Sequence, residues 1–245
     1  MKVTVLGKYG PFPGPGGACS GYLIEEGTAK VLIDCGNGVL ARLQEICPVW
    51  DLTAIILSHL HSDHISDMMI LRYALSIWSA RGMLEDKSLK VYAPPEPEEE
   101  FERLFYQNVY DIEPILEGME IPLAELNVRF WEMTHPIQSF GMEITNGTKK
   151  LFYTGDTNWN DRIAGIAAGA DLLMADTGLL ARDKTGPNVP HLTAAEVGRI
   201  AAEAGVKKLM VTHIWPGYAE QDLLDEVSKY YPAAFIPQEM GSYEI

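Results

Sequence analysis

The chain has 245 residues, of which 47% are hydrophobic and 22% charged, and its formal net charge is −15. This is an ordinary globular composition with enough apolar residues for a sizeable core, and the acidic charge disfavours binding of a long nucleic acid. No apolar run approaches the length of a membrane-spanning helix, so we expect no contact with a membrane.

The N-terminal segment and the cysteines indicate the compartment. The opening "MKVTVLGKYGPFPG" has too short an apolar stretch for a signal peptide and breaks into Gly and Pro. The three cysteines, Cys19, Cys35 and Cys47, form no CxxC pair and cannot all pair internally. We therefore expect a reduced, cytoplasmic setting.

Short β-type runs and helical patterns follow one another in the first half of the chain. Apolar, β-rich runs bounded by Gly and Pro predict strands, and apolar residues at helical spacing predict helices. We expect strands at 2–7, 21–26, 30–36, 53–58 and 90–94, helices at 38–46, 67–80 and 95–109, and a loop at 10–17. In the last of these helices, Glu98, Glu99 and Glu100 suit the positive end of the helix dipole.

The second half begins with consecutive strands and then alternates strands with helices. We expect strands at 126–135, 139–145, 150–156, 171–176 and 208–213, a turn at Asn146-Gly147, and helices at 160–168, 193–205 and 219–230. This mixture predicts an α/β protein with two sheets covered by helices. Without a low-complexity linker, we expect a single domain over residues 1–245.

One short segment, "SHLHSDHI" at 58–65, holds three of the six histidines. His59 and His61 are two residues apart at the end of a predicted strand, so their side chains can point the same way. Asp63 and His64 follow in the turn. Imidazole nitrogens and carboxylate oxygens bind Zn²⁺, and catalytic zinc sites keep one position open for water. A merely polar surface turn is the alternative, and the density of the cluster argues against it.

Three further candidates also follow predicted strands, namely His135, Asp156 and His213. Residues at strand ends are well placed to converge on one edge of a sheet. Taken singly, each residue is weak evidence for a metal site, because a lone His or Asp at a strand end is more often a turn residue.

Together, these residues and their order resemble the metallo-β-lactamase superfamily, from "VLIDCG" at 31–36 to "VTHIW" at 211–215. The resemblance implies a four-layer αββα sandwich of two mixed β-sheets flanked by helices, with two divalent metal ions between the sheets. It assigns His59, His61 and His135 to the first metal, Asp63, His64 and His213 to the second, and Asp156 to both. Zn²⁺ is favoured, and Mn²⁺ or Fe are the alternatives. It also implies that Asp34 orders the ligand loop.

The sixth histidine, His191, lies just before a predicted helix. Here the chain resembles the phosphodiesterase branch, which includes tRNA 3′-processing endonucleases. The resemblance implies that His191 assists the leaving oxygen and that Asp176 orients it. Asp176 is one methylene shorter than the usual glutamate, so the sequence leaves that contact open. From spacing alone, a helix-capping role fits His191 equally well. The catalytic candidates are His191, Asp176 and Asp63.

Departures from the tRNA-processing enzymes favour a small substrate. Only 20 residues separate His135 from Asp156, which leaves no room for a tRNA-binding arm, and the N-terminal loop "GKYGPFPGPGGACSG" lacks the basic residues of those enzymes. We therefore expect a phosphodiesterase acting on a small cyclic phosphate or nucleotide, with Trp215, Tyr218 and the loop at 10–17 around the pocket. The alternatives are a lactone or ester hydrolase and a tRNA 3′-end endonuclease. A non-enzymatic metal-binding protein is disfavoured because no ligand is missing. The sequence leaves open whether the chain forms a homodimer.

Overall fold

Two seven-stranded sheets form the centre of the computed structural model, which describes residues 1–84 and 88–245. The strand order is β14-β1-β2-β3-β4-β5-β6 in the first sheet and β13-β12-β11-β10-β9-β8-β7 in the second. The strands of the first sheet are β1 Lys2–Gly7, β2 Gly21–Glu26, β3 Ala29–Ile33, β4 Ala54–Ile56, β5 Leu89–Ala93, β6 Tyr110–Pro114 and β14 Ser242–Glu244. Those of the second are β7 Glu120–Leu123, β8 Leu126–Glu132, β9 Phe140–Thr145, β10 Lys150–Tyr153, β11 Leu172–Asp176, β12 Leu209–Thr212 and β13 Ala234–Phe235.

Both sheets are mixed, and they follow the same plan. In the first, the pairs from β14 to β3 are antiparallel and the pairs from β3 to β6 are parallel. In the second, the pairs from β7 to β10 are antiparallel and the pairs from β10 to β13 are parallel. The parallel half of each sheet needs crossover segments, and most of the helices lie there.

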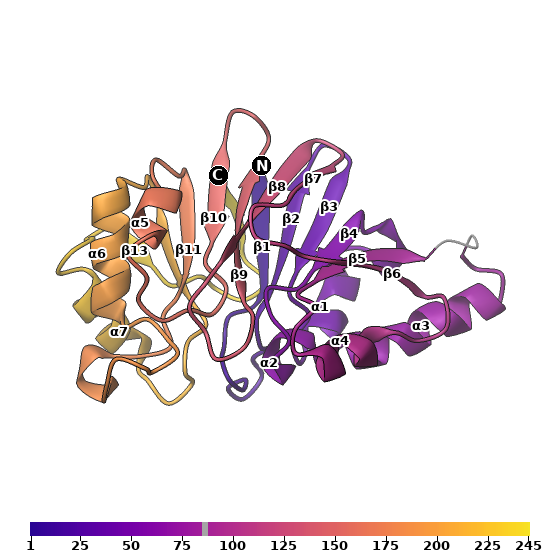
Figure 1. Cartoon of the computed structure of the whole chain (residues 1–245), viewed down its shortest axis with the longest axis horizontal. Coiled ribbons are helices and arrows are strands. Elements are labelled where there is room, and N and C mark those ends of the chain that lie inside the picture. The colour runs from indigo at the N-terminus through magenta and orange to yellow at the C-terminus, as the bar shows by residue number, and fades with distance from the viewer. Residues whose placement is uncertain (85–87) are drawn as a thin grey trace.

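The helices cover the outer faces of the two sheets (Figure 1). They are α1 Val39–Ile46, α2 Ser62–Ile65, α3 Met68–Ala80, α4 Glu98–Leu104, α5 Ile163–Ile166, α6 Ala194–Ala204 and α7 Glu220–Val227. One apolar core lies between the sheets, a second joins the first sheet to α1, α3 and α4, and a third joins the second sheet to α5, α6 and α7. The predicted four-layer αββα sandwich is therefore confirmed.

Local sequence explains how the layers form. In β8, Leu126, Val128 and Phe130 alternate with less buried residues, as expected where one face of a strand packs into the core. All five residues of β11 are buried, because a parallel strand in the middle of a sandwich is covered on both faces. Helix α6 begins with a capping box between Thr193 and Glu196, which satisfies free amide groups of its first turn.

Most predicted elements are present, with differences at their ends. The helix predicted at 95–109 spans only Glu98–Leu104, because the chain then leads into β6, and the helix predicted at 160–168 spans only Ile163–Ile166. The sequence patterns do not predict strands β6, β7, β13 and β14. Among the described residues, no helix is long and apolar enough to cross a membrane. Within the same part of the chain, the three cysteines are buried and unpaired.

Candidate metal centre

The predicted metal ligands all follow strands that end at one edge of the sandwich. His59 and His61 follow β4 of the first sheet, whereas His135, Asp156 and His213 follow β8, β10 and β12 of the second. The segment after β4 continues into α2, whose N-cap is His61 and which contains Asp63 and His64. The two sheets therefore deliver side chains to a common site, and the structure brings all seven predicted ligands together.

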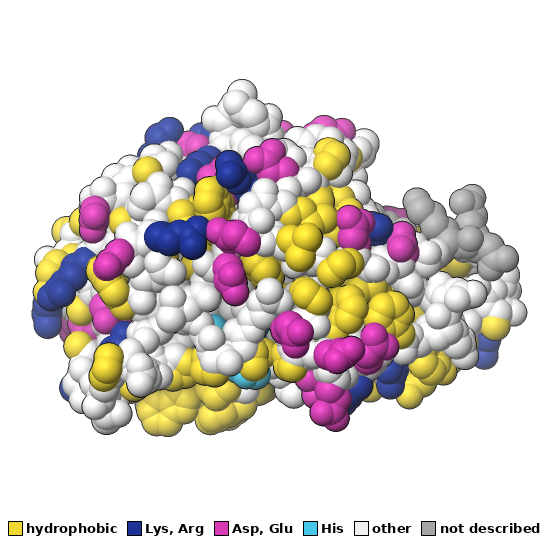
Figure 2. Space-filling model, viewed as in Figure 1, with side chains coloured by type: hydrophobic (Ala, Val, Ile, Leu, Met, Phe, Trp, Pro, Cys, Tyr) yellow, Lys and Arg dark blue, Asp and Glu magenta, His cyan; other side chains and the backbone are white. Residues whose placement is uncertain are grey.

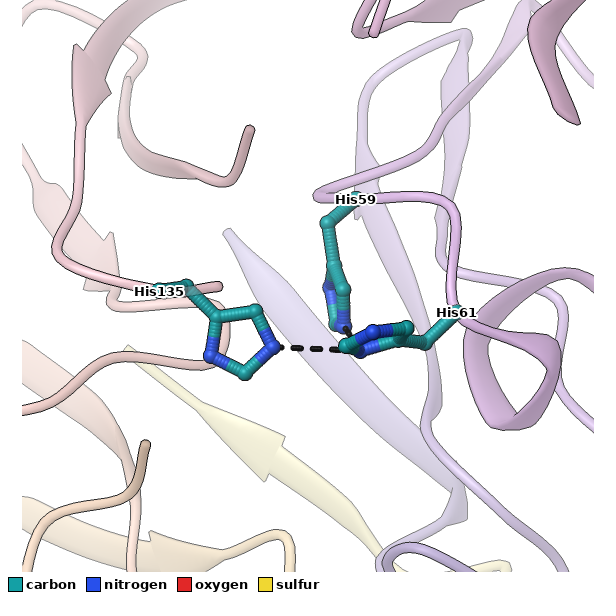
Figure 3. A group of neighbouring side chains, drawn as sticks. All are labelled: His59, His61 and His135. Atoms are coloured by element: carbon teal, nitrogen blue, oxygen red, sulfur yellow. Dashed lines mark hydrogen bonds between the residues drawn. The ribbon is translucent and has the colours of Figure 1, made fainter. Parts of the chain in front are cut away.

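The first cluster consists of His59, His61 and His135 (Figure 3). His61 Nδ1 lies 3.1 Å from His59 Nε2 and 3.1 Å from His135 Nε2. Figure 3 shows the three rings turned toward one another, two from the segment after β4 and one from the opposite sheet. Two nitrogens bound to one tetrahedral zinc ion would be about 3.3 Å apart, given the usual Zn–N bond length. The spacing therefore fits a shared metal ion.

The second cluster consists of Asp63, His64, Asp156 and His213. His213 Nε2 lies 3.2 Å from Oδ2 of Asp63 and 3.2 Å from Oδ2 of Asp156. His64 Nε2 lies 3.3 Å from Asp156 Oδ1 and 3.6 Å from Asp63 Oδ2. Asp156 Oδ2 is also 3.6 Å from His59 Nε2 of the first cluster. Asp156 thus lies between the two clusters, as expected of a ligand that both metals share.

The ring nitrogen that faces away from each cluster is hydrogen-bonded in three of the five histidines. His64 Nδ1 donates to Asp34 Oδ2 at 2.8 Å, and His135 Nδ1 donates to the carbonyl oxygen of Pro190 at 3.2 Å. His59 Nδ1 makes the third such bond, with Ser58 Oγ at 3.1 Å, and His213 Nδ1 lies 3.3 Å from Asp176 Oδ1 without a hydrogen bond between them. Such partners select the tautomer and turn the lone pair of the other nitrogen toward a metal.

The charge states of the clusters differ. Burial lowers the pKa of His59 well below its usual value, and the pKa values of His61 and His135 are also lowered, first of all by burial. The first cluster therefore offers neutral imidazoles, the form that binds metals. In the second cluster, burial opposes the charged imidazolium of His64, but Asp156, Asp34 and Asp63 outweigh it and hold its pKa well above the usual value.

Two buried polar atoms of the second cluster indicate whether a metal ion fits there. His64 Nε2 and Asp156 Oδ1 are buried and have no hydrogen-bond partner among the residues that the structure describes, although they lie 3.3 Å apart. Leaving buried polar atoms unpaired is costly, so such pairs are rare unless something else binds them. A divalent cation accepts both a neutral imidazole nitrogen and a carboxylate oxygen. The donor set of both clusters therefore fits metal ions.

His191 lies beside the clusters and outside the seven-residue ligand set. Its ring is stacked on that of His213, with centroids 5.0 Å apart, and its Nδ1 donates to Asp176 Oδ2 at 3.0 Å. Burial opposes its charge, but Asp176 outweighs it and raises the pKa of His191. The contact that the sequence leaves open is thus present. Asp176 Oδ1 also lies 3.3 Å from His213 Nδ1, so one buried carboxylate lies beside both rings.

One side of the site is accessible. His59, His64 and His213 are buried, whereas His61, His135 and His191 are partly exposed. A substrate would therefore approach from the side of these three rings. His191, whose side chain is 20% exposed, lies where a proton donor can reach a bound substrate.

The structure adds supporting residues that the sequence does not indicate. Tyr153 donates to Asp34 Oδ2 at 2.9 Å, and Ser58 donates to both oxygens of Asp34 through its backbone and its hydroxyl. Gly10 packs so closely on His213 that a β-carbon there would overlap its Nε2. Asp34 and His213 have positive φ angles of 56° and 52°, a strained backbone conformation that concentrates at functional sites.

The layer order and the two clusters at the strand ends define a metallo-β-lactamase fold. The chain belongs to the β-lactamase superfamily, because the family described as "Beta-lactamase superfamily domain" matches residues 29–214.

Relatives extend over nearly the whole chain. A Bacillus subtilis protein described as "Probable metallo-hydrolase YhfI" is 34% identical over 229 residues, which cover 94% of this chain and 93% of the relative. The crystal structure of YhfI has a TM-score of 0.91 at 31% identity and covers 99% and 98% of the two chains. A ribonuclease Z from Haloferax volcanii is 23% identical and covers 100% and 95%. The structure of human short-form tRNase Z, with a TM-score of 0.78 at 19% identity and coverage of 100% and 99%, is similar in fold.

Proposed function

We propose that this protein is a metal-dependent hydrolase that cleaves a small phosphodiester, such as a cyclic phosphate or nucleotide. The observation that carries the proposal is the position of His191. It is held by Asp176, stacks on a predicted metal ligand, and lies on the accessible side of the clusters. Phosphodiester cleavage expels an alkoxide, which needs a proton donor at this place.

Each side chain then has a defined task. His59, His61 and His135 would hold one divalent ion, and Asp63, His64 and His213 a second, with Asp156 between them. When bound, two such ions supply an activated water and neutralise charge on the phosphate oxygens. His191 donates its Nε2 proton to the leaving oxygen, and Asp176 keeps the ring in the donating orientation by accepting from Nδ1. Asp63 is 10% exposed and borders the accessible side.

The loops around the site support a small substrate. The β9–β10 hairpin occupies most of the segment between His135 and Asp156. In this hairpin Lys150 pairs with Thr145 and Tyr153 with Met142. This leaves only short connections in which a tRNA-gripping arm could be inserted. The net charge of −15 also opposes a polyanion with many phosphates.

The descriptions of the relatives support a hydrolase, and they name different substrates or reactions. The Bacillus subtilis relative is described as a metallo-hydrolase, the Haloferax volcanii relative as a ribonuclease Z, and one structural neighbour as a diphosphatase of the PhnP family. A small phosphodiester shares the phosphate chemistry of the latter two without requiring an extended RNA surface.

Metal analysis and a substrate panel test the proposal. Elemental analysis should find close to two transition-metal ions per chain, with Zn²⁺ as the expected metal. The metal-loaded protein should hydrolyse bis-p-nitrophenyl phosphate and 2′,3′-cyclic nucleotides far better than a simple lactone. At most one ion after reconstitution with excess zinc would contradict the two-metal site. Faster turnover of the lactone would establish an ester hydrolase, and efficient processing of tRNA precursors would establish an endonuclease.

A further inference from the structure

Two loops pack against each other beside His213. Gly10 N donates to the carbonyl oxygen of Ile214 at 3.1 Å, and Ile214 N donates to that of Lys8 at 2.9 Å. Further along, a β-carbon on Gly14 would lie 3.4 Å from Cβ of Pro216, which is ordinary van der Waals contact. The loop at 10–17 and the loop at 214–218 therefore form one continuous surface next to the second metal-ligand cluster.

Each loop exposes one large aromatic side chain. Phe12 is 52% exposed and Trp215 is 41% exposed. Figure 2 shows histidine surface at the lower edge of the molecule with hydrophobic side chains beside it. Phe12 follows Gly10 by two residues and Trp215 follows His213 by two. We call Phe12 and Trp215 the aromatic rim of the site.

The tryptophan of the aromatic rim is held in place. Its ring meets that of Tyr218 edge-on, with centroids 4.8 Å apart, and it covers Gly217 so closely that a β-carbon there would overlap it. Tyr218 in turn donates to Asp183 Oδ2 at 2.7 Å. A fixed, exposed aromatic face loses little entropy when a ligand binds, so it is suited to stacking.

The cations that contact these loops are already paired. Lys8 Nζ lies 2.7 Å from Glu220, and Arg42, which donates to the carbonyl oxygen of Gly16, lies 2.6 Å from Glu239. These carboxylates neutralise both cations, so the loops are poorly suited to bind a second phosphate of the substrate. The two exposed aromatic rings are then the groups on these loops that we expect to add affinity beyond the metal site.

From this arrangement we propose that the aromatic rim binds a nucleobase, so that the substrate is a nucleoside phosphodiester with a single phosphate. A flat ring joined to a phosphodiester is, in biological molecules, most commonly a base. This inference rests on the proposed phosphodiesterase function and narrows its substrate class. Stacking on an aromatic side chain tolerates any base, so the aromatic rim selects for a base and little among bases.

The test compares two five-membered cyclic phosphates, adenosine 2′,3′-cyclic phosphate and glycerol 1,2-cyclic phosphate, which carries no base. Trp215→Leu and Phe12→Leu keep an apolar side chain and remove the ring. Each should raise KM for the adenosine substrate about 10–100-fold, the size expected for loss of one base–aromatic stack. KM for the glycerol substrate should rise much less, because this substrate has no base to lose. The matched control is Trp50→Leu, an exposed tryptophan that packs on Trp78 in the opposite helical layer and should change neither value.

Calorimetric binding of adenosine monophosphate to the metal-loaded protein gives a second readout, with weaker binding expected in both rim variants. If the rim variants raise KM equally for both cyclic phosphates, or for neither, the aromatic rim does not bind the base. The phosphodiesterase proposal would stand in either case. If the protein binds adenosine monophosphate through the rim but hydrolyses no phosphodiester, the rim is supported and the proposed function is wrong.

Discussion

The hydroxyl of Tyr153, on the second sheet, donates to Oδ2 of Asp34, on the first, across the interior of the sandwich at 2.9 Å. The same oxygen accepts from His64 Nδ1 at 2.8 Å. All three residues are fully buried. Tyr153 therefore links the packing of the two sheets to the orientation of a predicted metal ligand.

Tyr153→Phe should weaken binding of the second metal while the first stays bound. Removing the hydroxyl takes one hydrogen bond from Asp34 and loosens the His64 ring, and such supporting contacts are typically worth about 10–100-fold in metal affinity. Zinc competition with a chromophoric chelator measures both affinities. Tyr110→Phe is the control, because its buried hydroxyl donates to the carbonyl oxygen of Met68. Equal effects in the two variants would show that Tyr153 acts on stability alone.

Gly10→Ala should empty the second cluster without altering any ligand. A β-carbon at this position overlaps His213 Nε2, so the imidazole has to move away from Asp63 and Asp156. We expect metal content to fall from about two ions toward one per chain, with seven ligands still in the sequence. Gly14→Ala, in the same loop, meets only ordinary contacts and should keep full metal content. An unchanged metal content in Gly10→Ala would mean that the loop at 10–17 can shift to make room for the β-carbon.

The His191→Ala variant should retain its metal content and have a lower turnover. If His191 is the general acid, turnover of alkoxide-releasing substrates should fall about 10²–10⁴-fold, and p-nitrophenolate-releasing substrates, which need little protonation, should lose much less. Asp176→Asn should show the same pattern more mildly in turnover. Because Asp176 also contacts His213, the Asp176→Asn substitution should lower the affinity for the second metal as well. Loss of metal in His191→Ala would instead make this residue a ligand.

Asp171 gives a prediction for stability away from the site. Its carboxylate accepts from Lys207 at 2.8 Å, Lys150 N at 2.9 Å and Lys149 at 3.3 Å, and these contacts, Lys207 first, lower its pKa to about 2. Since the folded pKa lies below the unfolded one, the contribution is complete above about pH 4 and is lost as the pH falls toward 2.

Asp171→Asn should therefore lower the free energy of unfolding at pH 7 by roughly 1–2 kcal/mol, a value reduced for solvent screening of the exposed lysines. Urea titrations of both proteins at several pH values measure this difference, which should shrink between pH 4 and pH 2. A difference that stays constant with pH would exclude the ion pairs as its source.

The sequence predicts the central strands well and picks out the residues that the structure brings together in the two clusters, because both follow from local patterns. His59, His61 and His64 lie within six residues, and His213 follows a short apolar run that is typical of a buried strand. The edge strands carry no such pattern. In β6, Asp111 and Glu113 are polar, and β13 has two residues, so neither stands out from a loop.

Contacts between distant segments are the part that the sequence does not predict. Nothing near Gly10 indicates that it touches His213, and nothing near Tyr153 indicates a bond to Asp34. For Asp176, the resemblance suggests one partner, His191, and the structure shows a second, His213. These relationships depend on how the two sheets dock, which is a property of the whole core.

The chain order of the ligands has a consequence for synthesis on the ribosome. The three histidines of the first cluster have all been made once the chain reaches His135, whereas the second cluster cannot be complete until His213, after β12, has been made. Between these two events, a nascent chain has His59, His61 and His135 available and lacks part of the second set. If the protein binds two metal ions as proposed, an ion that arrives before His213 has been made can meet only the first cluster, and the second cluster can bind its ion only near the end of translation or after release.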